Sequence, residues 1–234
     1  MAVLFSNDFA AGDFSEWTSK TDTASKLSVV GGTVIGGQPN NMAVLYDATT
    51  AALVQQDITW STRFLRFRFQ MGTNTVVPSN NFIWGLLRDS GGATRGRFEF
   101  NADLSGRTSV VHNGGESFIT WGAGEIGPNS TIEYELIRSS APATADGEMH
   151  LYIDGSETGT PLGLTGLTLD ATTSVIDNLR FGLISALDAG SSGTFYMGDF
   201  IANDDGVEIG IPPAATNSIS VGIRRRRRKS SIHQ

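Results

Sequence analysis

The feature that most constrains the fold is an alternation of apolar and polar residues with a period of two. In the segment 63–71, apolar residues occupy every second position from Leu65 to Met71, and arginine or glutamine occupies the positions between them. A period of two matches a β-strand, whose successive side chains point to opposite faces of a sheet. The same pattern recurs in 97–101, 131–137, 149–154, 179–183 and, through Phe195, Met197 and Ile201, near residue 200. Helical periodicity is almost absent, so we expect less than about 10% helix.

Turn signals separate these segments. The chain contains 28 glycines, many in pairs such as Gly31-Gly32 or after Asn and Asp, as in Asn113-Gly114 and Asp154-Gly155. Such dipeptides form tight turns between antiparallel strands. We therefore predict about twelve to fourteen short strands in an all-β, antiparallel β-sandwich over residues 3–205. The apolar residues expected in its core are Leu65, Phe67, Phe69, Phe98, Phe100, Tyr134, Leu136, Leu151, Ile153, Phe181 and Leu183.

Composition excludes several classes of protein. The chain has no cysteine, which excludes disulfides, thiolate metal sites and cysteine nucleophiles. Only three histidines are present, one of them in the terminal segment, which argues against a three-histidine metal site. No apolar run approaches the ~20 residues of a membrane span, so no membrane partner is expected. The first residues lack the basic segment of a secretory signal.

The charge is divided between two parts of the chain. Six of the 17 basic residues are Arg224, Arg225, Arg226, Arg227, Arg228 and Lys229, which leaves 11 basic and 24 acidic residues, a net charge of −13, in the remainder. Pro212-Pro213 favours an extended linker. We therefore divide the chain into a sandwich domain, residues 1–210, and a linker with a basic C-terminal arm, residues 211–234.

The arm has a second feature suited to assembly. Ile219, Val221 and Ile223 alternate with other residues and form a candidate strand that can extend a neighbour's sheet edge. The basic residues that follow can bind the acidic body of another copy, or a capsid or tail protein. Nucleic acid is expected as a partner only through this arm, because the body is acidic. A solvated terminus without a partner is the alternative.

Three parts of the sequence resemble a known family. The opening Asn7–Trp17 looks like the start of many viral and extracellular jelly-roll modules. The segments 133–138 and 147–155, with Tyr152-Ile153-Asp154-Gly155, resemble strands of the laminin-G-like, concanavalin A-like fold, and 179–183 with 193–200 is similar to its final strands. The resemblance covers residues 3–205 and implies a jelly roll in which the last strand pairs beside the first.

Modules of this kind occur in bacterial surface proteins, carbohydrate-active enzymes and structural proteins of tailed phages, so the resemblance leaves several functions open. The absence of a recognisable signal peptide and the basic arm favour a non-enzymatic virion structural protein, either a capsid decoration or a tail-associated jelly roll. A lectin-like module that binds a surface glycan, on a virion or at the cell surface, is the alternative. A carbohydrate-active enzyme is the third.

The enzyme hypothesis depends on paired carboxylates. Related glycoside hydrolases of the concanavalin A-like fold carry Glu-x-Asp-x-Glu on one strand, and this sequence has no such run. Glu133 and Glu135 share a strand face, but Arg66, Arg68 and Arg138 are available to pair with them. We therefore expect these glutamates on an open sheet face, beside arginine or solvent, and we predict no catalytic residues.

Two binding sites remain as hypotheses. Related sandwiches hold a structural Ca²⁺ near their terminal strands, and the candidate ligands here are Asp8, Asp13, Asp199 and Asp204. These acids can otherwise cap turns or lie in water. Trp121, in a glycine-rich segment, is the tryptophan that we single out as exposed and available to stack on a sugar ring; anchoring in the core or in a loop is the alternative, and we weigh it more heavily for each tryptophan.

Overall fold

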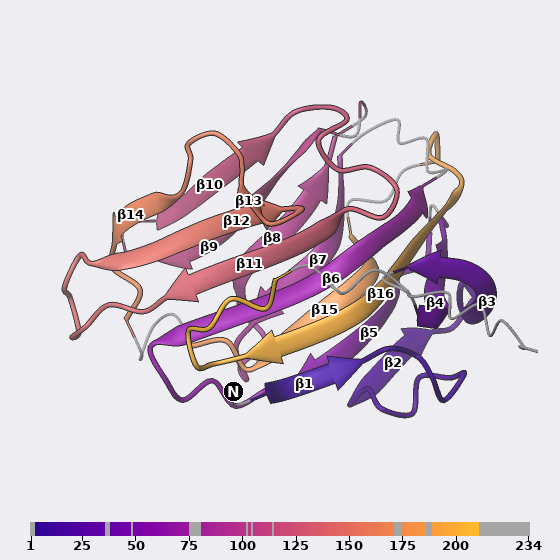
Figure 1. Cartoon of the computed structure of the whole chain (residues 1–234), viewed down its shortest axis with the longest axis horizontal. Coiled ribbons are helices and arrows are strands. Elements are labelled where there is room, and N and C mark those ends of the chain that lie inside the picture. Colours follow the sequence, from indigo (N-terminus) through magenta and orange to yellow (C-terminus); the bar gives the residue numbers. More distant parts are fainter. Residues whose placement is uncertain are drawn as a thin grey trace, which may run out of the picture.

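The chain folds as two antiparallel β-sheets packed face to face (Figure 1). The computed structural model describes residues 3–35, 38–47, 49–74, 81–101, 103, 105–113, 115–170, 175–185 and 189–210. The described residues contain no helix, and hence none long and apolar enough to cross a membrane. The all-β sandwich predicted from the period-two pattern is confirmed.

Sixteen strands are described, and every pair of neighbours is antiparallel. The strands are β1 (Val3–Asn7), β2 (Ser19–Asp22), β3 (Leu27–Ile35), β4 (Gln38–Leu45), β5 (Ala52–Asp57), β6 (Phe64–Asn74), β7 (Phe82–Arg88), β8 (Thr94–Phe100), β9 (Gly106–His112), β10 (Gly115–Trp121), β11 (Thr131–Ile137), β12 (Gly147–Ile153), β13 (Ser156–Glu157), β14 (Leu164–Leu167), β15 (Asn178–Ser185) and β16 (Thr194–Asn203). The number exceeds the predicted twelve to fourteen. Strands such as the two-residue β13 are too short to produce an alternating pattern.

The two sheets have different sizes and orders. The nine-stranded sheet has the order β13-β12-β11-β6-β16-β4-β3, with β1 beside β16 and β14 beside β12. The seven-stranded sheet has the order β10-β9-β8-β7-β15-β5-β2. In Figure 1, β6, β11, β12 and β16 lie in front of the fainter β7, β8 and β9. The first strand therefore pairs with the last, as the family resemblance implies.

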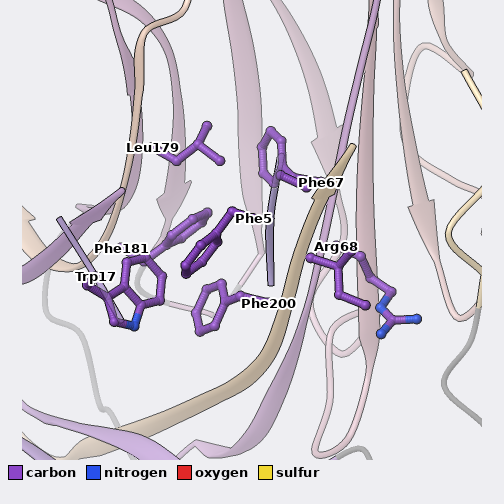
Figure 2. Close-up of a pocket in the computed structure, with 9 residues that line it drawn as sticks. Phe5, Trp17, Phe67, Arg68, Leu179, Phe181 and Phe200 are labelled. Carbon is purple, nitrogen blue, oxygen red and sulfur yellow. The ribbon is translucent and has the colours of Figure 1, made fainter. Parts of the chain in front are cut away.

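The core lies between the sheets and contains all eleven predicted core residues, each at most 6% exposed. Its centre is aromatic: the ring of Phe67 contacts those of Phe69, Phe98 and Tyr134, at centroid distances of 5.1 to 6.5 Å. Phe5 and Phe200 lie beside a void of about 10 Å³ (Figure 2). That volume holds at most one water molecule, so the gap is a packing defect and not a ligand site.

A bulge in β16 interrupts the period-two alternation near residue 200. Asp199 has a positive φ of 52°, and the pairing of β16 with β6 shifts register between Gly198 and Ile201. A bulge of this kind inserts an extra residue and changes which side chains face inward. Phe200 and Ala202 are therefore buried in the core, and Ile201 is only half-buried. The prediction that Ile201 continues the buried face of Phe195 and Met197 is wrong.

Candidate functional site

Charged residues cover the outer face of the nine-stranded sheet where β6, β11 and β12 lie side by side. In this register Glu135 is opposite Arg66 on β6 and His150 on β12. Glu133 is opposite Arg68 and Tyr152 in the next row. Opposite charges on neighbouring strands attract one another across such rows.

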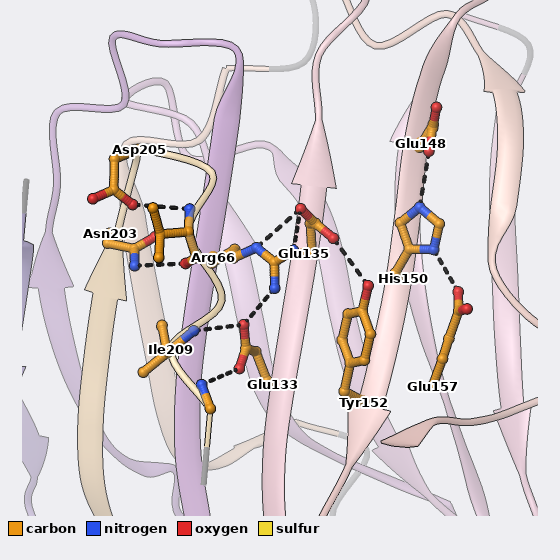
Figure 3. A network of polar contacts seen from close by, with 12 residues as sticks. Arg66, Glu133, Glu135, Glu148, His150, Tyr152, Glu157, Asn203, Asp205 and Ile209 are labelled. Carbon is orange, nitrogen blue, oxygen red and sulfur yellow. Dashed lines mark hydrogen bonds and ion pairs between the residues drawn. The ribbon is translucent and has the colours of Figure 1, made fainter. Parts of the chain in front are cut away.

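Arg66 joins the two glutamates (Figure 3). Its Nη1 donates to Glu133 Oε1 at 2.7 Å, and its Nε donates to Glu135 Oε1 at 2.9 Å. The hydroxyl of Tyr152 donates to the second oxygen of Glu135 at 3.2 Å. Burial alone would lower the pKa of Arg66, but the two carboxylates outweigh it and raise this pKa. The guanidinium is therefore charged at any physiological pH.

Residues 205–210, which we call the C-terminal strap, fold back over this face after β16. The backbone N–H groups of Ile209 and Gly210 donate to the two oxygens of Glu133, at 3.1 and 3.0 Å. Arg68 donates to the carbonyl of Gly210, and Asn203 donates to the carbonyl of Val207. Figure 3 shows Ile209 directed at Glu133 beside Arg66. These contacts bury charged groups that the sheet alone would leave in water.

The surroundings of Glu133 and Glu135 bear on whether the two carboxylates form a catalytic pair. Glu133 and Glu135 are each 4% exposed, and each of their four carboxylate oxygens accepts a hydrogen bond. The prediction that they pair with arginine is confirmed. The prediction that they lie on an open face is wrong, because the strap covers Glu133. Buried, paired and fully bonded carboxylates suit a structural network.

His150 extends the network to the edge of the sheet. Its Nε2 lies 3.0 Å from Glu148 and its Nδ1 lies 2.5 Å from Glu157 (Figure 3). Partial burial lowers the pKa of His150, but the hydrogen bonds to Glu157 and Glu148 outweigh that effect and raise it. The imidazolium is therefore favoured between two carboxylates.

A groove of about 270 Å³ lies where β1 meets β16, and two of the predicted calcium ligands line it. They are Asp8 and Asp199, and Glu16 lines the same groove. Asp199 is 6% exposed and lies 2.5 Å from Arg68. Burial raises the pKa of Asp199 and nearby Asp8 adds to this, against the lowering effect of Arg68.

The four predicted calcium ligands do not converge. Asp13 accepts hydrogen bonds from Ser15, and Asp204 accepts one from Ser61. Among the described residues, no group of three or more His, Asp or Glu side chains is placed to hold a metal ion. Asp199 already has Arg68 as its counter-charge, so the acids as arranged do not form a calcium cage.

Trp121 is in the core and not exposed. It is the last residue of β10, is 3% exposed, and its ring lies 6.1 Å from that of Phe100. The expectation of an exposed Trp121 is therefore wrong. The signal that identifies its position is its period-two relation to Ile119, which is also buried. The predicted assembly residues Ile219, Val221, Ile223 and 224–229 lie outside the described residues.

A second groove, of about 350 Å³, lies on the seven-stranded sheet, and no sequence pattern predicts it. Hydrogen-bonding side chains dominate its lining, which consists of Gln55, Asp57, Ile58, Ser90, Asp177 and Asn178. Asp57 and Asn178 are opposite each other on β5 and β15. Asp177 accepts a hydrogen bond from the backbone of Ser90 in the β7–β8 turn, at 2.7 Å. These residues come from three segments that are far apart in the sequence, so no local motif contains them all.

The paired sheets, with the first strand beside the last, define a jelly-roll β-sandwich of the concanavalin A-like kind. No protein-family model matches the sequence, and no curated protein matches it significantly. Solved structures with the same fold do match.

The chain is similar to the cellulose-induced protein Cip1, with a TM-score of 0.59, 17% identity, and coverage of 88% of this chain and 99% of that one. It is also similar to a structure of botulinum neurotoxin type C, a toxin whose cell entry is dependent upon interaction with two ganglioside molecules. The TM-score is 0.56 at 10% identity, over 88% of this chain and 49% of that one. A third match is the T. cruzi calreticulin globular domain, with a TM-score of 0.53 and 13% identity, over 87% and 88% of the two chains. At these identities the matches show the fold alone. They give no support to a virion role.

Proposed function

We propose that this chain is a carbohydrate-binding, lectin-like module that binds glycans without catalytic turnover. The observation that carries the proposal is the 350 Å³ groove on the seven-stranded sheet, lined by amide, carboxylate and hydroxyl side chains. Its volume is at the lower end of the range for small-molecule sites. Amides both donate and accept hydrogen bonds and carboxylates accept them, which complements the donor and acceptor character of sugar hydroxyls.

Two further points support the proposal. The paired glutamates Glu133 and Glu135 are occupied by Arg66, Tyr152 and the strap, so they do not offer a free acid and a free base. The fold is shared with botulinum neurotoxin type C, a toxin that interacts with gangliosides, which are glycolipids. Binding to a surface glycan is therefore a function that this scaffold can perform.

The test is a glycan array probed with the labelled full chain, followed by isothermal titration calorimetry with the best-retained glycan. We expect Gln55→Ala and Asp57→Asn to weaken binding, because each removes groups that line the groove. Asp8→Asn, a matched change in the other groove, should leave affinity unchanged. The proposal is wrong if no glycan is retained, or if Gln55→Ala and Asp57→Asn bind as well as the unchanged chain.

A further inference from the structure

Two arginines lie side by side on the outer face of the seven-stranded sheet, next to the proposed glycan groove. Arg180 is on β15 and Arg88 is on β7, where Arg88 is opposite Asn178 and Arg180 is opposite Leu86. The two arginines are therefore diagonal neighbours, within reach of each other's long side chains. Leu179 and Phe181 alternate with these positions and point into the core, so the arginine side chains point outward.

These two arginines differ from the others on the same sheet. Arg95 lies 2.6 Å from Asp89, Arg97 lies 2.8 Å from Glu99, and Arg107 lies 2.5 Å from Glu99. In the described part of the chain, neither Arg88 nor Arg180 has a carboxylate within ion-pair distance. Arg88 donates its Nε to the carbonyl of Gly92 at 2.7 Å. Within the described residues, the buried Nε of Arg180 has no hydrogen-bond partner.

An unpaired arginine beside a second one is electrostatically unfavourable. Burial lowers the pKa of Arg180 and the neighbouring charge of Arg88 lowers it further, while Asp57 acts in the opposite direction without pairing with it. A buried donor without an acceptor also costs free energy. A carboxylate group from outside would offset the repulsion between the two cations, and the planar fork of arginine suits bidentate binding of such a group.

Asn178 connects the arginines to the groove. It lines the groove, and on β15 it lies between Arg88 on one side and Asp57 on the other. Asn178 is 8% exposed, and its side-chain oxygen has no hydrogen-bond partner. An unsatisfied amide acceptor at this position is available to a hydroxyl of a bound molecule.

The acids of the groove restrict how an anionic molecule can lie there. Asp57 accepts a hydrogen bond from Gln55 and Asp177 accepts one from the backbone of Ser90. Both repel another carboxylate but accept hydrogen bonds from hydroxyls. The negative group of a ligand is therefore favoured on the side of Arg88 and Arg180, and its neutral hydroxyls on the side of Asp57 and Asp177.

We propose that the site takes a carboxylated glycan such as a uronic-acid sugar, with its hydroxyls in the groove and its carboxylate on Arg180 and Arg88. This inference rests on the proposed glycan-binding function and specifies the class of ligand. Calorimetry with trigalacturonate and with its methyl ester, in which a methyl group replaces the negative charge of each carboxylate, tests it. We expect trigalacturonate to bind about tenfold more tightly or better, because one charge-assisted contact contributes roughly that factor.

Arginine variants test which residues produce the preference for the acid over its methyl ester. Arg180→Gln and Arg88→Gln should each remove most of the difference in affinity between acid and ester. Arg180→Lys, which keeps the positive charge but not the planar guanidinium, should retain part of this difference. Arg95→Gln, whose arginine is paired with Asp89, is the matched control and should retain all of it. Raising the salt concentration should weaken binding of the acid more than binding of the ester.

The outcomes separate the two proposals. If acid and ester bind equally, or if the preference survives Arg180→Gln and Arg88→Gln, the inference is wrong while glycan binding stands. If neither ligand binds and the glycan array is also blank, the proposed function fails and the inference fails with it. Melting temperatures of all variants show whether a lost preference reflects unfolding, and Arg180→Lys with the salt series provides the test if Arg180→Gln does not fold.

Discussion

At the scale of single residues, Glu133 on β11 links β6 and the C-terminal strap on the outer face of the nine-stranded sheet. It accepts hydrogen bonds from Arg66 on β6 and from the backbone of Ile209 and Gly210 in the strap. A buried charge with this many partners is costly to change, because its partners lose their counter-charge or acceptor together.

We therefore expect Glu133→Gln to reduce the free energy of unfolding by about 3 kcal/mol, since it leaves Arg66 with one carboxylate fewer in a buried site. Denaturant unfolding followed by circular dichroism measures the change. Glu125→Gln is the control, because Glu125 is exposed. A loss for Glu133→Gln as small as that for Glu125→Gln would contradict the structural role of the network.

His150 gives a pH dependence with a defined sign. Its pKa in the folded protein is raised above the ordinary 6.5 because Glu157 and Glu148 hydrogen bond to it, against the lowering effect of burial. A raised folded pKa stabilises the protein below the unfolded pKa, and this contribution is lost as pH rises through the folded pKa. The melting-temperature difference between the unchanged chain and His150→Gln should be larger at about pH 5.5 than at about pH 8.5. An equal difference at both pH values would show that the two carboxylates do not favour the imidazolium.

At the scale of elements, the strap depends on a chain reversal after β16. Gly206 has a φ of 74°, and a Cβ at this position would lie 2.9 Å from the ring of Phe64. Only glycine adopts this conformation without strain, and the ring leaves no room for a side chain. The reversal directs Ile209 and Gly210 to Glu133.

Gly206→Val should therefore destabilise the chain by about 1–3 kcal/mol, the usual cost of a strained backbone conformation. Hydrogen exchange at the amides of Ile209 and Gly210 should accelerate, because the strap can no longer hold them on Glu133. Gly127→Ala is the control, since a Cβ at Gly127 would have no atom within 4 Å and no positive φ is recorded there. Unchanged exchange at both amides in Gly206→Val would mean that the strap does not depend on this turn.

At the scale of the whole molecule, the unequal distribution of charge still predicts an assembly role for residues 211–234. The body carries a net charge of −13, and the arm carries the six consecutive basic residues. Opposite charges on two parts of one chain favour contact between copies, and salt screens such contact.

Deleting residues 211–234 should leave a folded, acidic monomer or small oligomer that no longer assembles. Replacing Arg224–Lys229 by six glutamines keeps the length of the chain and should have the same effect. Light scattering after size-exclusion chromatography at low and high salt measures the assembly. If the deleted chain and the full chain have the same mass under both conditions, the arm is a solvated terminus.

The fold class and the inward faces of the main strands could be predicted from the sequence alone. The alternation around Phe67 predicts buried positions correctly, because the pleat of a strand fixes side-chain direction from local sequence alone. The same argument predicts that Glu133 and Glu135 point away from the core, and Arg66 was available in the sequence as their partner.

The contacts between residues that are distant in the sequence become apparent only from the folded structure. The bulge at Asp199 reversed the orientation expected for Ile201, and the strap buried Glu133 on what would otherwise be an open face. The groove joins Gln55, Ser90 and Asn178 through strand order and register. The physical reason is that a period-two pattern specifies which face of a strand a residue occupies. It does not specify which strands become neighbours or where the chain reverses.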